Sequence, residues 1–176
     1  MKLYFRLLLL LLTQSKRTRC TIFGPAETQF RVLPNDLDAF LHVNNGVYLT
    51  LMDLGRIDLL LRSNTLSALR KEGWSPVLAA ETIRFKKPLR LWQRFSIVTR
   101  VLGWDENSVY VEQVFTSKGV VVAKAVVDTR FLSKGGELVS SEKLINFLNI
   151  TTPSPELPDW VQNWIHSNKQ IPTETI

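Results

Sequence analysis

The pattern of hydrophobic and polar positions divides the chain into an early strand, a long helix and a series of later strands. Apolar and polar residues roughly alternate over 28–33, as in a strand with one buried face. Between about Gly46 and Arg62, apolar residues recur at spacings of three and four with few polar residues between them, which predicts a largely buried helix. A shorter helix is predicted over 66–71, ending at Gly73.

Four further stretches have the composition of strands and are separated by polar turns. The last two turns, at 104–108 and 117–119, are short enough for hairpins, so the last three strands are predicted to form an antiparallel meander. The order of one strand, one buried helix and four strands indicates an α+β fold. The predicted later strands are residues 77–85, 95–102, 109–116 and 120–131.

The two ends of the chain differ in composition from its centre. The N-terminal end holds an unbroken leucine run, Leu7 to Leu12. The C-terminal end holds a predicted helix over 142–148, several prolines and a last helical segment, whose Trp160 and Trp164 are predicted to dock on the core. We therefore predict an N-terminal apolar and basic segment, a central domain and a C-terminal helical extension, over residues 1–27, 28–132 and 133–176.

The leucine run is too short to cross a bilayer, which takes about 20 apolar residues. No small-residue cleavage site follows it, so export is not expected, and we predict a cytoplasmic location. Two interpretations stay open: residues 1–19 contact an anionic membrane surface, or the run packs on the protein itself or at a subunit contact. The basic residues that flank the run are Lys2, Arg6, Lys16, Arg17 and Arg19.

Composition limits the chemistry that the chain can perform. The 22 Lys and Arg residues against 16 Asp and Glu residues give a net charge of +6. A single cysteine, Cys20, excludes an internal disulfide or a cysteine-based zinc site and indicates a reducing compartment, and two histidines leave little for a metal centre. The sequence has no glycine-rich phosphate loop, Gly-x-Ser-x-Gly or His-Glu-x-x-His motif. We therefore expect neither a metal nor a cofactor.

The densest polar cluster, residues 35–46, lies immediately before the long helix. Asn44 or Asn45 is a natural N-cap, so the first N–H groups of the helix would point outward and attract an oxygen on which negative charge develops. Asp38 can approach this helix end through the turn, and a carboxylate facing a polarised carbonyl is a minimal acyl-transfer site. In isolation, such an aspartate, or a lone histidine such as His42, is more often structural.

The segment from Asp36 to Leu49, with Asp53 and Arg56 after it, closely resembles the Asp-x-Asp-x-x-Gly-His-Val-Asn-Asn-x-x-Tyr signature of hotdog-fold acyl thioesterases. This group includes the 4-hydroxybenzoyl-CoA thioesterase type and the plant acyl-ACP thioesterases. Residues 82–89 resemble the second strand of the family, and the resemblance covers about 28–132. The leucine-rich start and the Pro-Trp tail resemble its poorly characterised thioesterase-like branch.

The resemblance implies a hotdog fold, in which an antiparallel sheet of about five strands wraps around a long central helix, here with extra C-terminal helices. It implies subunits paired as a homodimer or homotetramer, with active sites at their interface. The implied activity is thioester hydrolysis by an acyl-CoA thioesterase of lipid metabolism, acting on a fatty or aromatic acyl group carried by coenzyme A or by a carrier protein. No nucleic-acid partner is expected.

The resemblance also assigns roles to single residues. Asp38 takes the position of the catalytic carboxylate, as a nucleophile or as a general base toward water. The backbone N–H of Asn45 takes the oxyanion position, His42 matches a histidine that some acyl-ACP members use, and Tyr48 would line the pocket. Phe40, also expected at the substrate, replaces an asparagine of the plant enzymes, which leaves more of the chemistry to Asp38.

Two further features bear on the substrate. Leu41 stands where the family has a glycine, which would narrow the pocket mouth or shift the turn. Arg84, Lys86 and Lys87 are predicted to meet the phosphates of coenzyme A or an acidic carrier, while a solvated, charge-protected strand edge is the alternative. The competing function is a catalytically weak hotdog protein that binds acyl thioesters or fatty acids at a membrane surface.

Overall fold

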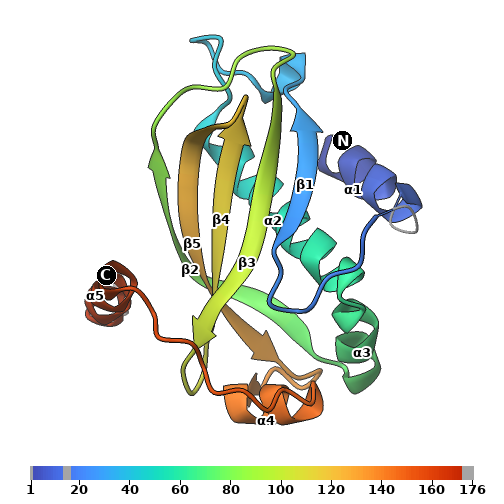
Figure 1. Cartoon of the computed structure of the whole chain (residues 1–176), viewed down its shortest axis with the longest axis vertical. Coiled ribbons are helices and arrows are strands. Elements are labelled where there is room, and N and C mark those ends of the chain that lie inside the picture. Colours follow the sequence, from blue (N-terminus) through green and yellow to red (C-terminus); the bar gives the residue numbers. More distant parts are fainter. Residues whose placement is uncertain (1, 14–16, 172–176) are drawn as a thin grey trace.

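The chain folds into one curled antiparallel sheet wrapped around a long helix (Figure 1). The computed structural model describes residues 2–13 and 17–171, so Lys16 of the predicted basic flank lies outside the described residues. The helices are α1 (Lys2–Thr13), the 3-10 turn η2 (Pro34–Asp36), α2 (Asn45–Arg62), α3 (Thr65–Glu72), α4 (Ser141–Phe147) and α5 (Asp159–Lys169). The strands are β1 (Ala26–Arg31), β2 (Ser75–Phe85), β3 (Arg94–Trp104), β4 (Val109–Ser117), β5 (Val120–Leu132) and β6 (Leu138–Val139).

The strand order is β1-β3-β4-β5-β2, and β6 pairs with β5. Every pairing is antiparallel, which confirms the predicted meander of β3, β4 and β5 and the α+β class. The two-residue strand β6 was not predicted, because two residues are too few to show an alternating pattern. The sheet ends at β1 on one side and at β2 on the other.

Helix α2 packs closely on the sheet at Gly55, where the absence of a side chain leaves room for two polar side chains of the sheet. A Cβ atom at this position would lie 2.8 Å from Gln113 Nε2 and 2.9 Å from Thr99 Oγ1. The Gln113 amide donates to the Met52 carbonyl over 2.9 Å, so strand β4 and the helix share a buried hydrogen bond. This contact fixes where α2 sits, and therefore where its N-terminus opens.

Aromatic rings fill the core beneath the first turn of α2. Tyr48 packs against Phe85 and Phe115, with ring centroids 5.0 and 5.2 Å apart. Phe115 continues to Phe95 at 6.2 Å, and Phe95 to Phe30 at 5.6 Å. The stack spans β2, β4, β3 and β1, and gives the start of α2 a rigid support.

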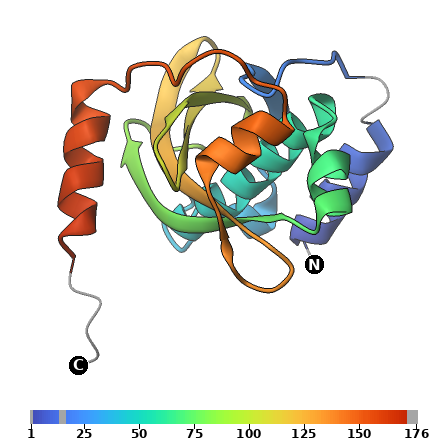
Figure 2. The same ribbon diagram turned by 90° about the horizontal axis from the view of Figure 1, so that it is seen from below.

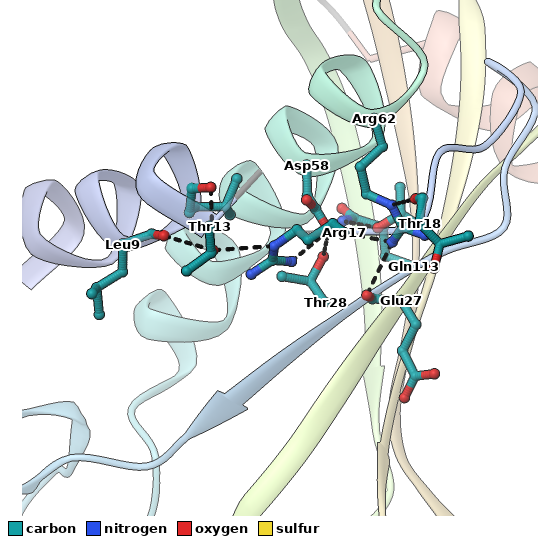
Figure 3. Close-up of polar contacts among 11 residues, drawn as sticks. Leu9, Thr13, Arg17, Thr18, Glu27, Thr28, Asp58, Arg62 and Gln113 are labelled. Atoms are coloured by element: carbon teal, nitrogen blue, oxygen red, sulfur yellow. Dashed lines mark hydrogen bonds and ion pairs between the residues drawn. The ribbon is translucent and has the colours of Figure 1, made fainter. Parts of the chain in front are cut away.

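The N-terminal segment is attached to this domain by apolar side chains of α1 and by contacts of arginine side chains. Leu10 of α1 is buried, and Arg6 Nη2 lies 2.6 Å from Asp36 Oδ2. After α1, Arg17 reaches Asp58 of α2, and Arg62 donates to the carbonyl of Thr18 over 2.6 Å (Figure 3). One face of α1 therefore packs on the protein. Its other face exposes the apolar side chains of Tyr4, Phe5, Leu8, Leu9, Leu11 and Leu12.

The C-terminal helices lie in different places: α4 crosses one end of the sheet, and α5 stands to one side of it (Figure 2). Helix α4 closes one end, where Phe147 packs on Trp74 with ring centroids 5.0 Å apart. The predicted docking of Trp160 on the core is wrong, because this residue is 45% exposed and Val161 fills the buried position of α5. The Lys124 ammonium lies 5.9 Å from the centre of the Trp160 ring, so the indole covers a charged group of β5. Trp164 is half-buried.

Candidate active site

An open cleft of about 440 Å³ lies at the N-terminus of α2. The loop between η2 and α2 forms one wall, and the end of β2 with the turn after it forms the other. Seven of the eight residues predicted for the site line this cleft, and Arg84 is the exception. The lining residues are Asp38, Phe40, His42, Val43, Asn45, Tyr48, Phe85, Lys86, Lys87 and Pro88.

One of the two carboxylate oxygens of Asp38 is hydrogen-bonded to its own loop. Its Oδ1 accepts hydrogen bonds from the backbone N–H groups of Phe40, over 2.9 Å, and His42, over 3.3 Å. The backbone closes the same turn, since the Asp38 N–H donates to the His42 carbonyl over 2.8 Å. Within the part of the chain that the structure describes, Oδ2 has no hydrogen-bond partner. The turn therefore orients the carboxylate and leaves one oxygen for chemistry in the cleft.

The start of α2 supplies an N–H group to the same cleft. Asn44 is the N-cap, and its Oδ1 accepts from the Gly46 N–H over 2.9 Å. The Asn45 N–H has no acceptor among the described residues, and Asn45 itself lines the cleft. A free N–H at the positive end of an 18-residue helix is suited to hold an oxygen that gains negative charge.

The backbone around His42 ties the two walls of the cleft together. His42 and Arg90 form an isolated antiparallel bridge, and the Val43 N–H donates to the Leu89 carbonyl over 3.0 Å. Leu41, next to His42, has a φ of 59°, in the left-handed region that glycine adopts most readily. This conformation gives the physical reason for the glycine of the related signature. The Leu41 side chain points to solvent, so the turn keeps its shape without a glycine.

Tyr48 forms the floor of the cleft one turn along α2. Burial raises the pKa of its phenol, so the hydroxyl stays protonated at neutral pH. Lys86 and Lys87 form the rim: their N–H groups bond to the Val122 carbonyl over 2.8 and 3.1 Å, and their side chains are exposed. Arg84 is exposed on β2 outside the cleft. The rim is thus cationic and the floor aromatic.

A second cavity, of about 400 Å³ and mostly apolar, lies under the other half of α2 and was not predicted. It shares no lining residue with the cleft, and begins roughly 12 Å along α2 at 1.5 Å per residue. The walls come from α2, α3, α4, strands β2 to β5 and the N-terminal segment. Apolar residues that line it include Leu7, Phe23, Ile57, Leu60, Val77, Phe131, Leu144 and Leu148.

The polar wall of this cavity carries a charged cluster. Arg56 pairs with Asp53 and donates to Gln113 Oε1 over 2.9 Å. Burial lowers the pKa of the Arg56 guanidinium, an effect that Asp53 and Glu81 oppose. Burial raises the pKa of the Glu81 carboxyl, against the attraction of Arg56. The cluster is already charge-compensated, so this cavity suits a neutral hydrocarbon chain better than an anion.

Comparison with known proteins decides the family. The model of the thioesterase-like superfamily matches residues 32–165, which include the cleft, α2 and the whole meander. The chain belongs to the thioesterase-like superfamily. This membership agrees with the hotdog architecture predicted from the sequence.

Three similar proteins illustrate this membership in the thioesterase-like superfamily. Protein THEM6 of Xenopus laevis is 38% identical over 138 residues, which cover 78% of this chain but only 65% of that protein. The probable thioesterase YbaW of Escherichia coli is 26% identical and has a TM-score of 0.65, over 69% of this chain and 95% of YbaW. The gentisyl-coenzyme A thioesterase BH1999, 21% identical with a TM-score of 0.62 over 69% of this chain and 99% of BH1999, shares the fold.

Within residues 2–13 and 17–171, no group of three or more His, Cys, Asp or Glu side chains is placed to hold a metal ion. In the same residues, no helix combines the length and apolar character that crossing a bilayer requires.

Proposed function

We propose that this member of the thioesterase-like superfamily hydrolyses acyl-CoA thioesters in the cleft at the start of α2. The observation that carries the proposal is the convergence of two groups on one cavity: the unpaired Oδ2 of Asp38 and the unpaired N–H of Asn45. If a thioester binds with its carbonyl oxygen at the Asn45 N–H, its carbonyl carbon becomes more electrophilic and lies beside the Asp38 carboxylate. Lys86 and Lys87 at the rim suit the phosphates of coenzyme A.

Hydrolysis then follows one of two routes. In the first, Asp38 attacks the carbonyl carbon, the C–S bond breaks, the thiolate leaves, and water hydrolyses the acyl-aspartyl anhydride. In the second, Asp38 takes a proton from the water that attacks the carbonyl carbon directly, and the C–S bond then breaks to release the thiolate and the free acid. A thiolate is a good leaving group, so neither route needs a strong acid. In this proposal His42, which lines the cleft, polarises water or substrate. Trapping an acyl adduct on Asp38 by mass spectrometry would select the first route.

The test is thiol release from a panel of acyl-CoA substrates, aliphatic and aromatic. The Asp38→Asn variant is expected to lose at least about a hundredfold in kcat/KM, the size typical for a positioned catalytic group. Asn keeps an oxygen for the N–H groups of Phe40 and His42, so the turn should survive. Asp159→Asn makes the same chemical change on exposed α5 and should leave the rate unchanged. Equal rates in wild type and Asp38→Asn would remove Asp38 from catalysis.

The apolar cavity supports a second candidate, a protein that binds acyl thioesters or fatty acids with little turnover. Its volume of about 400 Å³ and hydrocarbon lining suit an acyl chain. Raised thermal stability with an acyl-CoA, without thiol release from any member of the panel, would favour this candidate. Thiol release from short-chain substrates alone would count against it.

We extend the proposal to assembly and location. Strand β2 ends the sheet and exposes Leu78 and Phe85, which suits pairing with a second copy as a homodimer, or as pairs of dimers. Sedimentation velocity measures the oligomeric state directly, and a monomer at micromolar concentration would exclude the dimer.

The exposed apolar face of α1 supports contact with a membrane surface through residues of the N-terminal segment.

A further inference from the structure

Large apolar side chains protrude from two loops that flank the mouth of the cleft. Phe40 and Leu41 are 81% and 71% exposed, and Leu91 and Trp92 are 41% and 54% exposed. The two loops, residues 38–43 and 86–93, lie side by side because of the bridge between His42 and Arg90. They form one end of the molecule, at the top of Figure 1, which we call the loop end. Among the described residues, nothing buries these four side chains.

The backbone holds two of these side chains outward. Leu41 and Trp92 have φ values of 59° and 62°, which residues with a side chain adopt at a cost. Hydrogen bonds fix both conformations. The Leu41 N–H donates to the backbone carbonyl of Asp38, and the Trp92 N–H donates to the backbone carbonyl of Val32, each over 3.1 Å. A large apolar residue at a strained, exposed turn gains nothing in the isolated chain. Such positions therefore point to an external partner.

Basic side chains surround these apolar tips. The stretch from residue 84 to residue 94 contains no acidic residue. Of the nearby acids, Asp36 is buried and paired with Arg6, and Asp38 lines the cleft. The loop end is therefore positively charged around an apolar centre. The exposed basic residues are Arg31, Arg84, Lys86, Lys87, Arg90, Arg94 and, on the neighbouring hairpin, Lys118.

We propose that the loop end docks on the surface of a bilayer that contains anionic lipids, with the mouth of the cleft toward the lipid. Side chains that protrude from two separate turns suit insertion among headgroups, where tryptophan and phenylalanine are favoured, better than a flat protein contact. The surrounding basic residues attract anionic headgroups. This docking does not depend on hydrolysis: it is a property of the surface, and binding alone tests it.

The experiment uses the full chain and sedimentation with vesicles of phosphatidylcholine, with and without about 30% phosphatidylserine. The wild type is expected to bind the anionic vesicles at least about tenfold more tightly than the neutral ones. The double variant Leu41→Ser/Trp92→Ser should lose at least about tenfold in affinity for anionic vesicles. Arg90→Gln should lose about fivefold, an effect that salt abolishes.

The chain offers a matched control for the apolar variant. Leu138 and Trp160, both 45% exposed, lie on β6 and α5 away from the loop end. Leu138→Ser/Trp160→Ser removes the same two residue types and should change vesicle binding by less than about twofold. Equal losses in the two double variants would overturn the proposal. Thermal unfolding of each variant separates lost docking from lost fold.

A spectroscopic readout locates the contact. Brominated lipids quench tryptophans that enter the headgroup region, and Trp92→Phe keeps the apolar character at this position. Quenching by anionic brominated vesicles is expected in wild type and should largely disappear in Trp92→Phe while binding persists. Binding that survives Leu41→Ser/Trp92→Ser but is lost in Leu8→Ser/Leu12→Ser would assign the bilayer to α1 and refute docking of the loop end. A change of oligomeric state in Leu41→Ser/Trp92→Ser, with vesicle binding unchanged, would assign the surface to a second copy and also refute it.

Discussion

The loop end and the C-terminal half of α2 each hold an aspartate, in opposite environments. In the C-terminal half of α2, Asp58 is fully buried. Its Oδ2 accepts a hydrogen bond from the Thr28 hydroxyl over 2.7 Å and lies 3.0 Å from Arg17 Nη1 and 3.6 Å from Arg62 Nη1 (Figure 3). At the loop end, Asp38 is half-buried and only its Oδ1 is occupied. A carboxylate surrounded by cations holds segments together, while one with a free oxygen in a cleft is available to substrate.

The largest expected effect tests the structural side of this contrast. Asp58→Ala would leave Arg17, Arg62 and the Thr28 hydroxyl without their shared acceptor, so we expect a loss of about 3–5 kcal/mol in the free energy of unfolding. Urea unfolding measures it. Asp53→Ala, which removes a more exposed ion pair from the same helix, should cost about 0–1 kcal/mol. Similar losses in the two variants would mean that burial does not distinguish these aspartates.

The second prediction concerns the close approach of α2 to the sheet. Gly55→Ala places a methyl group against Gln113 Nε2, which is held by the Met52 carbonyl. Although alanine favours the helix, displacing this buried amide should give a net loss of about 1–3 kcal/mol, measured by urea unfolding. In a Gln113→Ala background the same change should cost little, because the displaced group is gone. A full loss in that background would place the strain elsewhere, for instance at Thr99.

Local sequence patterns predicted the core of the fold but not its long-range ties. The periodicity of α2 and the alternation of β3, β4 and β5 are set by neighbouring residues, so both were readable. The ion pair between Arg17 and Asp58 could not be predicted. The two residues are 41 positions apart in the chain, and Asp58 looks like an ordinary polar residue of a helix. Only the spacing of Asp58 and Arg62, one helical turn apart, gave a local signal.

The same reasoning applies to the site. The motif brought Asp38, His42 and Asn45 to attention together, and the structure places all three on one cleft. The apolar cavity could not be predicted, since its walls include residues of the N-terminal segment, α2, β2 to β5 and α4, which are far apart in sequence. Trp160 was misassigned because helical spacing indicates a packed face but not what that face contacts, here the Lys124 ammonium.

Glu81 is partly buried, between the fully buried Asp58 and the cleft residue Asp38, and its replacement is expected to change stability less than the changes at Asp58 and Gly55. It lies on β2 near Arg56, and burial raises the pKa of its carboxyl despite that cation. The folded chain therefore keeps the Glu81 proton to a higher pH than the unfolded chain does. As pH rises above about 4.3, the ordinary value for glutamate, the unfolded chain ionises first and is favoured. Stability from this group is thus present at low pH and lost as pH rises through the raised pKa.

Glu81→Gln should therefore stabilise the protein at neutral pH, by less than the changes at Asp58 and Gly55. The gain over wild type should be near zero below about pH 4, grow as pH rises, and become constant once Glu81 is ionised in both states. Urea unfolding from pH 4 to 8 measures it, and Glu137→Gln on the exposed β5–β6 turn should show no such rise. A variant that is less stable than wild type at neutral pH would show instead that ionised Glu81 is a necessary partner of Arg56. Glu81 would then belong with Asp58, as a carboxylate that holds the structure together.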